Sequence, residues 1–237
     1  MKRSRGDDHP DGTLVLLDGA GTEVLVVPIE VAEQLRLLIG RLRLNEVGDV
    51  PEVLGVISSL GGEGATTVAR GLALVLSNDA GRRVCVVDLN WWSPGWWPDD
   101  TEALGGIAEV IAAGAPLDAV LVHAGSPGLT LLPAGATALA ERPLLANSAE
   151  IDRVLVELRE RFDHVIVDLP AVAVTSDALT LAERVAPLLL VVQHGVTTDA
   201  DVRSAMERLT GIPILGTVFN RHQSKMPGFV RNRLPAV

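Results

Sequence analysis

A glycine-rich turn at residues 61–64 lies between a run of apolar residues and a segment of helical spacing that begins near Thr66. Glycines let backbone N–H groups turn toward one point, and the start of a helix adds the positive end of its dipole. The turn consists of Gly61, Gly62, Glu63, Gly64, Ala65, Thr66 and Thr67. This pattern predicts a phosphate-binding loop. The alternative is a tight turn without a ligand.

The elements that must position this loop follow from the hydrophobic pattern. From residue 53 onward, β-branched apolar runs alternate with helical segments, as in parallel strands joined by crossover helices. Strands are predicted at residues 53–57, 84–87, 129–132, 165–167, 188–192 and 214–219. Helices are predicted at residues 30–44, 66–77, 107–113, 148–161, 176–182 and 198–209. The fold class is therefore α/β, a mostly parallel twisted sheet with helices on both faces.

Two regions depart from this alternation. Short apolar runs at residues 14–17 and 24–27 predict a hairpin or a pair of edge strands. Residues 112–142 are rich in Ala, Gly and Pro, and we expect loops around a short strand there.

Composition excludes several function classes. The 237 residues carry a formal charge of −10, which argues against a groove that binds nucleic acid. The chain has no tyrosine, so it cannot phosphorylate itself on one. Cys85 is the single cysteine, so an internal disulfide is impossible and a reducing cytosol is expected. No apolar stretch reaches the ~18 residues of a membrane-spanning helix, and no apolar run follows the basic start as in a signal peptide.

The motifs and their order resemble the cytoplasmic domains of bacterial tyrosine kinases that regulate capsule and exopolysaccharide export, a branch of the P-loop ATPases that also include partition and division-site-positioning proteins. In that family the loop sequence is Pro-Gly-Glu-Gly-Lys-Ser/Thr-Thr, and later strands end in Asp-x-Asp and Asp-x-Pro-Pro. The matching residues here are 61–67, 88–90 and 168–171, followed by 216–221. The resemblance implies three parts: an N-terminal extension (1–29), a P-loop kinase-like domain (30–221) and a basic tail (222–237).

The departures from the family pattern concern charge. Ala65 stands where the loop lysine would reach the phosphates, and Leu60 replaces the lysine of the partition branch. The only lysines are Lys2 and Lys225. Losing a charged hydrogen bond of ~1.5–3 kcal/mol weakens nucleotide binding by roughly one to two decades, and the rate falls by another ~10²–10³. We therefore expect weak or absent binding of ATP, ADP and Mg²⁺, and no useful turnover.

The resemblance assigns roles to the remaining site residues. Thr66 would supply a hydroxyl to Mg²⁺, and Asp168 and Asp88 would be acids on the metal or water side. Asn90, where the family has an Asp, cannot act as a base, so the catalytic positions Asp88 and Asp168 are vestigial. The alternative is that both carboxylates cap turns at the sheet edge. Asn220 resembles the adenine-contacting Asn, with strand-end capping as the alternative.

Two surfaces are candidates for contacts with other chains. Glu33 and Arg36 match the start of the family's Glu-x-x-Arg-x-x-Arg ring-assembly motif, but Ile39 takes the last place; a solvated helix face is the alternative. All four tryptophans lie in one loop: Trp91, Trp92, Trp96 and Trp97. They cannot all turn inward from a loop, so we predict a contact with a partner or a membrane interface; the alternative is a lid that buries its own indoles.

The leading hypothesis is a pseudokinase-like regulatory or scaffold protein of exopolysaccharide or capsule biosynthesis and export. The resemblance implies a membrane-embedded chain-length or export protein as partner, which would hold this cytoplasmic chain at the inner membrane. One alternative is an active ATPase or protein kinase in which Arg70, or an arginine of the partner, replaces the lysine. Another is a partition-type positioning ATPase, which Leu60 disfavours.

Overall fold

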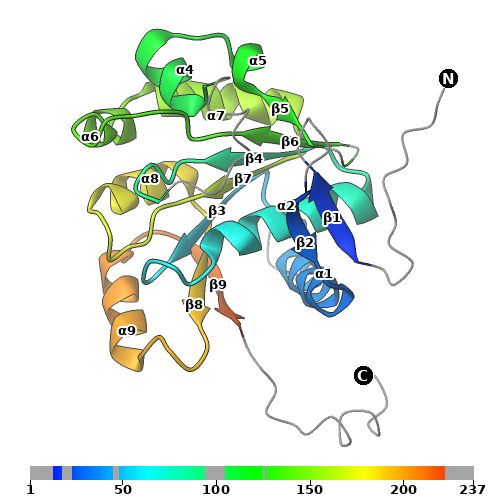
Figure 1. The fold of residues 1–237 in the computed structure, drawn as a ribbon. Coiled ribbons are helices and arrows are strands. Elements are labelled where there is room, and N and C mark those ends of the chain that lie inside the picture. The colour runs from blue at the N-terminus through cyan, green and yellow to red at the C-terminus, as the bar shows by residue number, and fades with distance from the viewer. Residues whose placement is uncertain are drawn as a thin grey trace, which may run out of the picture.

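A seven-stranded sheet crosses the described part of the molecule in the order β5-β6-β4-β7-β3-β8-β9 (Figure 1). The computed structural model describes residues 13–17, 23–44, 48–93, 105–124, 126 and 128–221. The strands are β3 (Val53–Ser58), β4 (Val84–Asp88), β5 (Val122–His123), β6 (Leu129–Leu132), β7 (His164–Asp168), β8 (Leu188–Gln193) and β9 (Ile214–Asn220). All neighbours pair in parallel except β5 with β6. The predicted mostly parallel sheet is therefore confirmed.

Helices connect the strands as the alternation predicted. They are α1 (Ile29–Arg43), α2 (Ala65–Ala80), α4 (Ile107–Ala113), α5 (Leu117–Val120), α6 (Arg142–Ala146), α7 (Glu150–Arg161), α8 (Asp177–Val185) and α9 (Asp199–Arg208). The prediction for residues 112–142 was incomplete. The short helix α5, which follows Pro116, and strand β5 also lie there, because Leu117, Val120 and Val122 are buried against the core.

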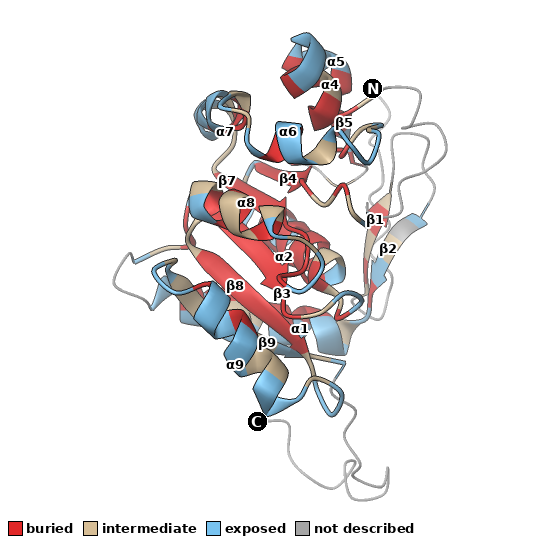
Figure 2. Cartoon of the chain, turned by 90° about the vertical axis from the view of Figure 1, so that its left-hand side faces the viewer, coloured by how far each residue is buried: buried red, intermediate tan, exposed pale blue. Residues whose placement is uncertain are grey.

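The sheet separates two apolar cores because successive strand residues point to opposite faces. On one face Val56 and Val86 pack with α1, α2 and the N-terminal strands. On the other face Ile57 and Val87 pack with α4 and α6 to α9. Strands β3, β4, β6, β7 and β8 are buried almost throughout, whereas the edge strand β9 is partly exposed (Figure 2). Continuous apolar runs were therefore the right signal for strands covered on both sides.

The predicted N-terminal hairpin is confirmed as an antiparallel pair, β1 (Leu14–Leu17) and β2 (Glu23–Val27). It contacts α2 beside α1, and Leu16 and Val27 are buried there. At Gly71 of α2 an added Cβ would lie 2.9 Å from Leu35 Cδ1, so a larger residue there would require the Leu35 side chain of α1 to shift. These contacts hold the start of α2, and with it the glycine loop, against the sheet.

Candidate functional site

The glycine loop leaves the carboxyl end of the inner strand β3 and enters α2 at Ala65. Gly62 and Gly64 have φ values of +83° and +92°, a conformation that side-chain-bearing residues rarely adopt. Among the described residues, none accepts a hydrogen bond from the backbone N–H groups of residues 61–67. A row of N–H donors at a helix N-terminus suits an anionic ligand such as phosphate.

The buried side chain of Glu63 holds this loop in shape. Its carboxylate accepts a hydrogen bond from the N–H of Leu60 over 2.9 Å and another from the hydroxyl of Thr197. Its backbone carbonyl accepts from Asn220 Nδ2 over 2.9 Å. Any contact of Glu63 with a ligand would therefore run through its backbone. The bond between Thr197 and Glu63 was not predictable from the local sequence, because the two residues lie 134 positions apart.

The two candidate acids lie side by side at the edge of the sheet. Asp88 and Asp168 are register partners at the ends of β4 and β7, and each is 1% exposed. The hydroxyl of Thr66 donates to Asp168 Oδ2 over 2.6 Å. Asp168 Oδ1 is buried and accepts no hydrogen bond from the described residues. The predicted grouping of Thr66, Asp88 and Asp168 is present in the structure, while their roles stay a prediction.

Asp88 and Asp168 also stabilise the local backbone. Asp88 Oδ1 accepts from the N–H of Asn90 over 2.9 Å, and the carbonyl of Asp168 accepts from the N–H of Leu89. Asn90 Oδ1 in turn accepts from the N–H of Ser93. Asp88 therefore caps the turn at the end of β4, which is the role given above as the alternative to metal binding.

Arg70 brings a positive charge to these acids. Its side chain belongs to the second turn of α2 and is 6% exposed. Burial lowers the pKa of the Arg70 guanidinium, and the charges of Asp88 and Asp168 oppose that shift. Burial and the neighbouring charge of Asp88 raise the pKa of Asp168 to about 8, although the hydrogen bond from Thr66 and the charge of Arg70 act in the other direction. A buried cation and two buried carboxyl groups are therefore electrostatic neighbours in this part of the molecule.

The loop itself has no lysine ammonium group, because Ala65 stands at the position of the family's lysine. Ala65 is the first residue of α2 and, at 7% exposure, is buried in the core beside the sheet. Lys2 and Lys225 lie outside the described residues. The sequence pointed to Arg70 only as one alternative. A stronger signal was available, since Arg70 is the one charged residue between residues 65 and 78.

Asn220 lies at the end of β9, directly against the loop. Besides its bond to Glu63, its Oδ1 accepts from the N–H of Arg221 over 2.9 Å, which is the strand-end capping considered as the alternative role. An added Cβ on Gly64 would lie 2.3 Å from Asn220 Nδ2. Contact of Asn220 with adenine stays a prediction.

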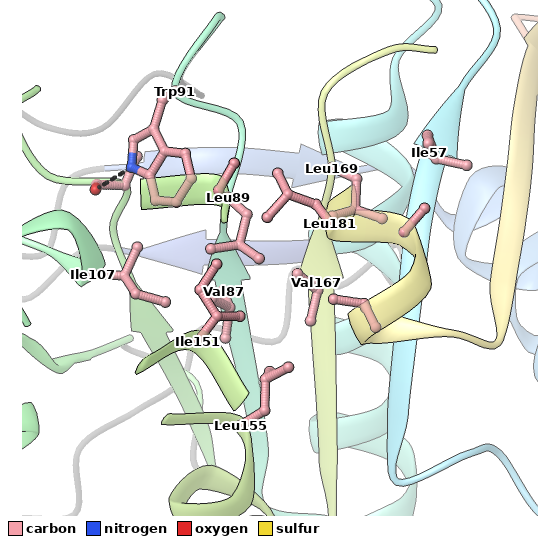
Figure 3. Packing of buried hydrophobic residues seen from close by; sticks show 14 of the residues in the cluster. Ile57, Val87, Leu89, Trp91, Ile107, Ile151, Leu155, Val167, Leu169 and Leu181 are labelled. Carbon is pink, nitrogen blue, oxygen red and sulfur yellow. Dashed lines mark hydrogen bonds between the residues drawn. The ribbon is translucent and has the colours of Figure 1, made fainter. Parts of the chain in front are cut away.

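The two described tryptophans of the loop differ in burial, because Trp91 lies in the core and Trp92 is partly exposed. Trp91 is 1% exposed, and its Nε1 donates to the carbonyl of Ala134 over 2.8 Å (Figure 3). Trp92 is partly exposed and stacks at a tilt on Trp91, with 6.2 Å between ring centroids. Trp96 and Trp97 lie outside the described residues. Trp91 is therefore part of the core, and the prediction of a partner contact was wrong for this residue.

The face predicted for self-association is used within the chain. Arg36 Nε donates to Asp79 Oδ2 of α2 over 2.5 Å, and Arg36 Nη1 donates to Glu33 Oε1 over 2.6 Å. Self-association through Glu33 and Arg36 stays a prediction. It would require Arg36 to share its bonds to Asp79 and Glu33 with a second copy of the chain, or to exchange them for bonds to that copy.

The resemblance implies two ligands, a nucleotide and Mg²⁺, and the site does not fit both equally well. The loop N–H groups suit the phosphates of a nucleotide. In the described ranges, no three His, Cys, Asp or Glu side chains gather as a metal site. The two acids already face the buried cation Arg70, and Thr66 already donates to Asp168. The acids therefore do not fit an added divalent cation, because the charge of Arg70 already acts on both of them. Among the helices described, none has the length and apolar character to cross a membrane.

Comparison with known proteins agrees with this geometry. A family model described as cellulose biosynthesis protein BcsQ matches residues 52–209. The chain is 26% identical over 186 residues to tyrosine-protein kinase CpsD of Streptococcus agalactiae, covering 76% of this chain and 79% of that protein. It is 29% identical over 185 residues to succinoglycan biosynthesis transport protein ExoP of Rhizobium meliloti, covering 73% of this chain but 23% of ExoP.

Solved structures lead to the same fold. The kinase domain of VpsO superposes with a TM-score of 0.72 at 26% identity, covering 82% of this chain and 96% of that domain. The predicted P-loop fold and the resemblance to bacterial tyrosine kinases and polysaccharide-export proteins are both confirmed.

Proposed function

The chain belongs to the family of the cellulose biosynthesis protein BcsQ, and we propose that it is a catalytically impaired P-loop protein of that family. It regulates or scaffolds an apparatus that makes and exports an extracellular polysaccharide. We infer that the apparatus contains a membrane-embedded partner; one relative, ExoP, is named as a succinoglycan biosynthesis transport protein. The chain would act from the cytoplasm, at the inner membrane, through this partner.

Ala65 is the observation that carries the proposal. In the kinases that the chain resembles, a lysine at this place balances the charge of the transferred phosphoryl group. Here a buried methyl group takes that place in a loop whose backbone is otherwise arranged for phosphate. We expect the binding of ATP or ADP to persist weakly, through the N–H groups of residues 61–67, while phosphoryl transfer is lost. Asn220 is the candidate contact for the base.

Restoring the lysine tests this proposal. Ala65→Lys is expected to tighten ATP binding by about tenfold or more, because one charge-assisted hydrogen bond to phosphate returns. Ala80→Lys, at the exposed opposite end of α2, adds the same charge away from the loop and should leave the affinity unchanged. Binding is measured by calorimetric titration, and phosphate release by the wild-type protein is expected to equal that of buffer. ATP turnover that disappears in Asp168→Ala contradicts the proposal.

The partner is tested on membranes of the source cells. The tagged chain should co-purify from detergent extracts with a membrane-embedded protein of polysaccharide synthesis or export. Recovery without any such protein, from cells that are making the polymer, argues against the scaffold role.

An active ATPase is the second candidate, and the position of Arg70 favours it. A buried arginine beside two acids could supply part of the missing charge. This candidate requires wild-type turnover that falls in Arg70→Lys, because lysine cannot reproduce the guanidinium geometry. A partition-type positioning ATPase is less favoured, since Leu60 lacks the lysine of that branch. An oligomer size that is independent of nucleotide would exclude it.

A further inference from the structure

We propose that Arg70 is a resident counter-ion that takes the place of a divalent cation beside Asp88 and Asp168, so that the loop binds its phosphate ligand without Mg²⁺. The proposal rests on the nucleotide-binding part of the proposed function. It adds that binding should not depend on Mg²⁺, and it names the residue responsible.

Helix geometry directs the buried Arg70 side chain toward the start of α2. Arg70 follows Thr66 by four residues, so both side chains lie on one face of α2. Helical side chains incline toward the N-terminus of their helix, which directs Arg70 toward the turn that carries Thr66. The 2.6 Å bond from Thr66 to Asp168 fixes that acid at the same point. The helix α2 packs on both β4 and β7, whose ends carry Asp88 and Asp168.

The charges explain why a cation belongs there. Two carboxyl groups at 1% exposure are costly to bury unless a positive charge accompanies them. Arginine keeps its charge when buried and offers several N–H donors to carboxylates. A divalent ion entering the same space would meet the guanidinium at close range, and the like charges would repel.

The setting of Arg70 shows that it is not an ordinary surface arginine. Its neighbours Ala69, Leu72 and Ala73 are fully buried and apolar. The exposed Arg153, in contrast, pairs with Glu150 and Glu157 of its own helix, whose carboxylates are partly exposed. Arg70 has instead both buried acids of the site as its electrostatic neighbours. Its loss should therefore leave an uncompensated acidic pair that Mg²⁺ can neutralise.

Thermal unfolding with MgCl₂ as the only added ligand tests this directly. At ~10 mM MgCl₂ the wild-type Tm should change by less than about 1 °C, whereas Arg70→Met should gain on the order of 3 °C or more. Adding Asp168→Asn to Arg70→Met should abolish that gain. Arg153→Met is the matched control and should respond as the wild type does. The proposal is overturned if Mg²⁺ stabilises the wild type and Asp168→Asn removes the effect, or if folded Arg70→Met does not respond.

Two further arms cover other outcomes. If Arg70→Met does not fold, the wild type and Arg70→Lys decide, because neither should be stabilised by Mg²⁺. Titration with a fluorescent ADP analogue should give affinities within about threefold in EDTA and in MgCl₂. A tenfold gain with Mg²⁺ overturns the proposal while leaving the scaffold function intact, and no binding in either buffer counts against a phosphate site. ATP turnover, in contrast, contradicts the proposed function and not the role of Arg70.

Discussion

Asn220 donates from its side-chain amide to the backbone carbonyl of Glu63 over 2.9 Å, and this bond joins the last strand of the sheet to the glycine loop. The two residues lie 157 positions apart. The shape of the phosphate-binding loop thus depends on the far edge of the sheet.

Asn220→Ala should therefore loosen the loop. We expect the free energy of unfolding to fall by about 1 kcal/mol, the typical contribution of one such hydrogen bond, and nucleotide binding to weaken in parallel. Thr217→Ala, an exposed position on the same strand, should change neither quantity. Urea denaturation and calorimetric titration measure the two effects. Unchanged nucleotide affinity in Asn220→Ala would show that the loop keeps its shape without this bond.

Gly64→Ala should be worse tolerated than Gly62→Ala. Both glycines have positive φ, so alanine costs roughly 1 kcal/mol at either position through backbone strain. Only at Gly64 does the new Cβ also meet a side chain, 2.3 Å from Asn220 Nδ2, whereas Gly62 has open space around it. The double variant Gly64→Ala/Asn220→Ala should recover the part of the loss that is due to the clash. Equal urea midpoints for the two single variants would contradict this account.

The bridge between Arg36 and Asp79 should make stability depend on pH. The hydrogen bond from Arg36 lowers the pKa of Asp79 below its ordinary value. The bridge therefore adds stability above the ordinary pKa of about 3.9, and this contribution is lost as the pH falls through the lowered folded value. Since each side chain is 31% exposed, solvent screening limits the effect to ~0.5 kcal/mol.

Asp79→Asn provides the measurement. Its unfolding free energy should be lower than that of the wild type at pH 7, and the two should converge near pH 2. The exposed Glu207→Gln serves as a control for loss of one negative charge. A difference that persists undiminished at pH 2 would assign the effect to packing and not to the ion pair.

The sequence predicted the fold well because the sheet is buried on both faces. Runs such as residues 188–192 are apolar without interruption, and only covered parallel strands favour that pattern. Helix ends were less predictable. The prediction ended one helix at residue 182, but α8 continues to Val185, whose buried side chain packs on the sheet. Such an extension depends on tertiary contacts that local pattern does not contain.

The site was predictable in its loop and acids, and less so in its supporting contacts. Motif order identified Thr66, Asp88 and Asp168, because strand ends of a parallel sheet meet at one edge. The bonds of Arg36 to Asp79 and of Thr197 to Glu63 join residues that are distant in sequence and have common polar side chains. No spacing rule distinguishes them before the chain is folded.

Trp91 is the residue for which sequence reasoning erred most, and its burial leads to a final prediction. A loop indole was expected at the surface, but the ring lies in the core and its Nε1 donates to Ala134. Trp91→Phe removes this donor and leaves a small cavity, which together should cost about 2–3 kcal/mol of unfolding free energy. Trp92→Phe, at a partly exposed ring, should cost less than ~1 kcal/mol. Urea denaturation followed by far-ultraviolet circular dichroism measures both, and equal losses would contradict the core role of Trp91.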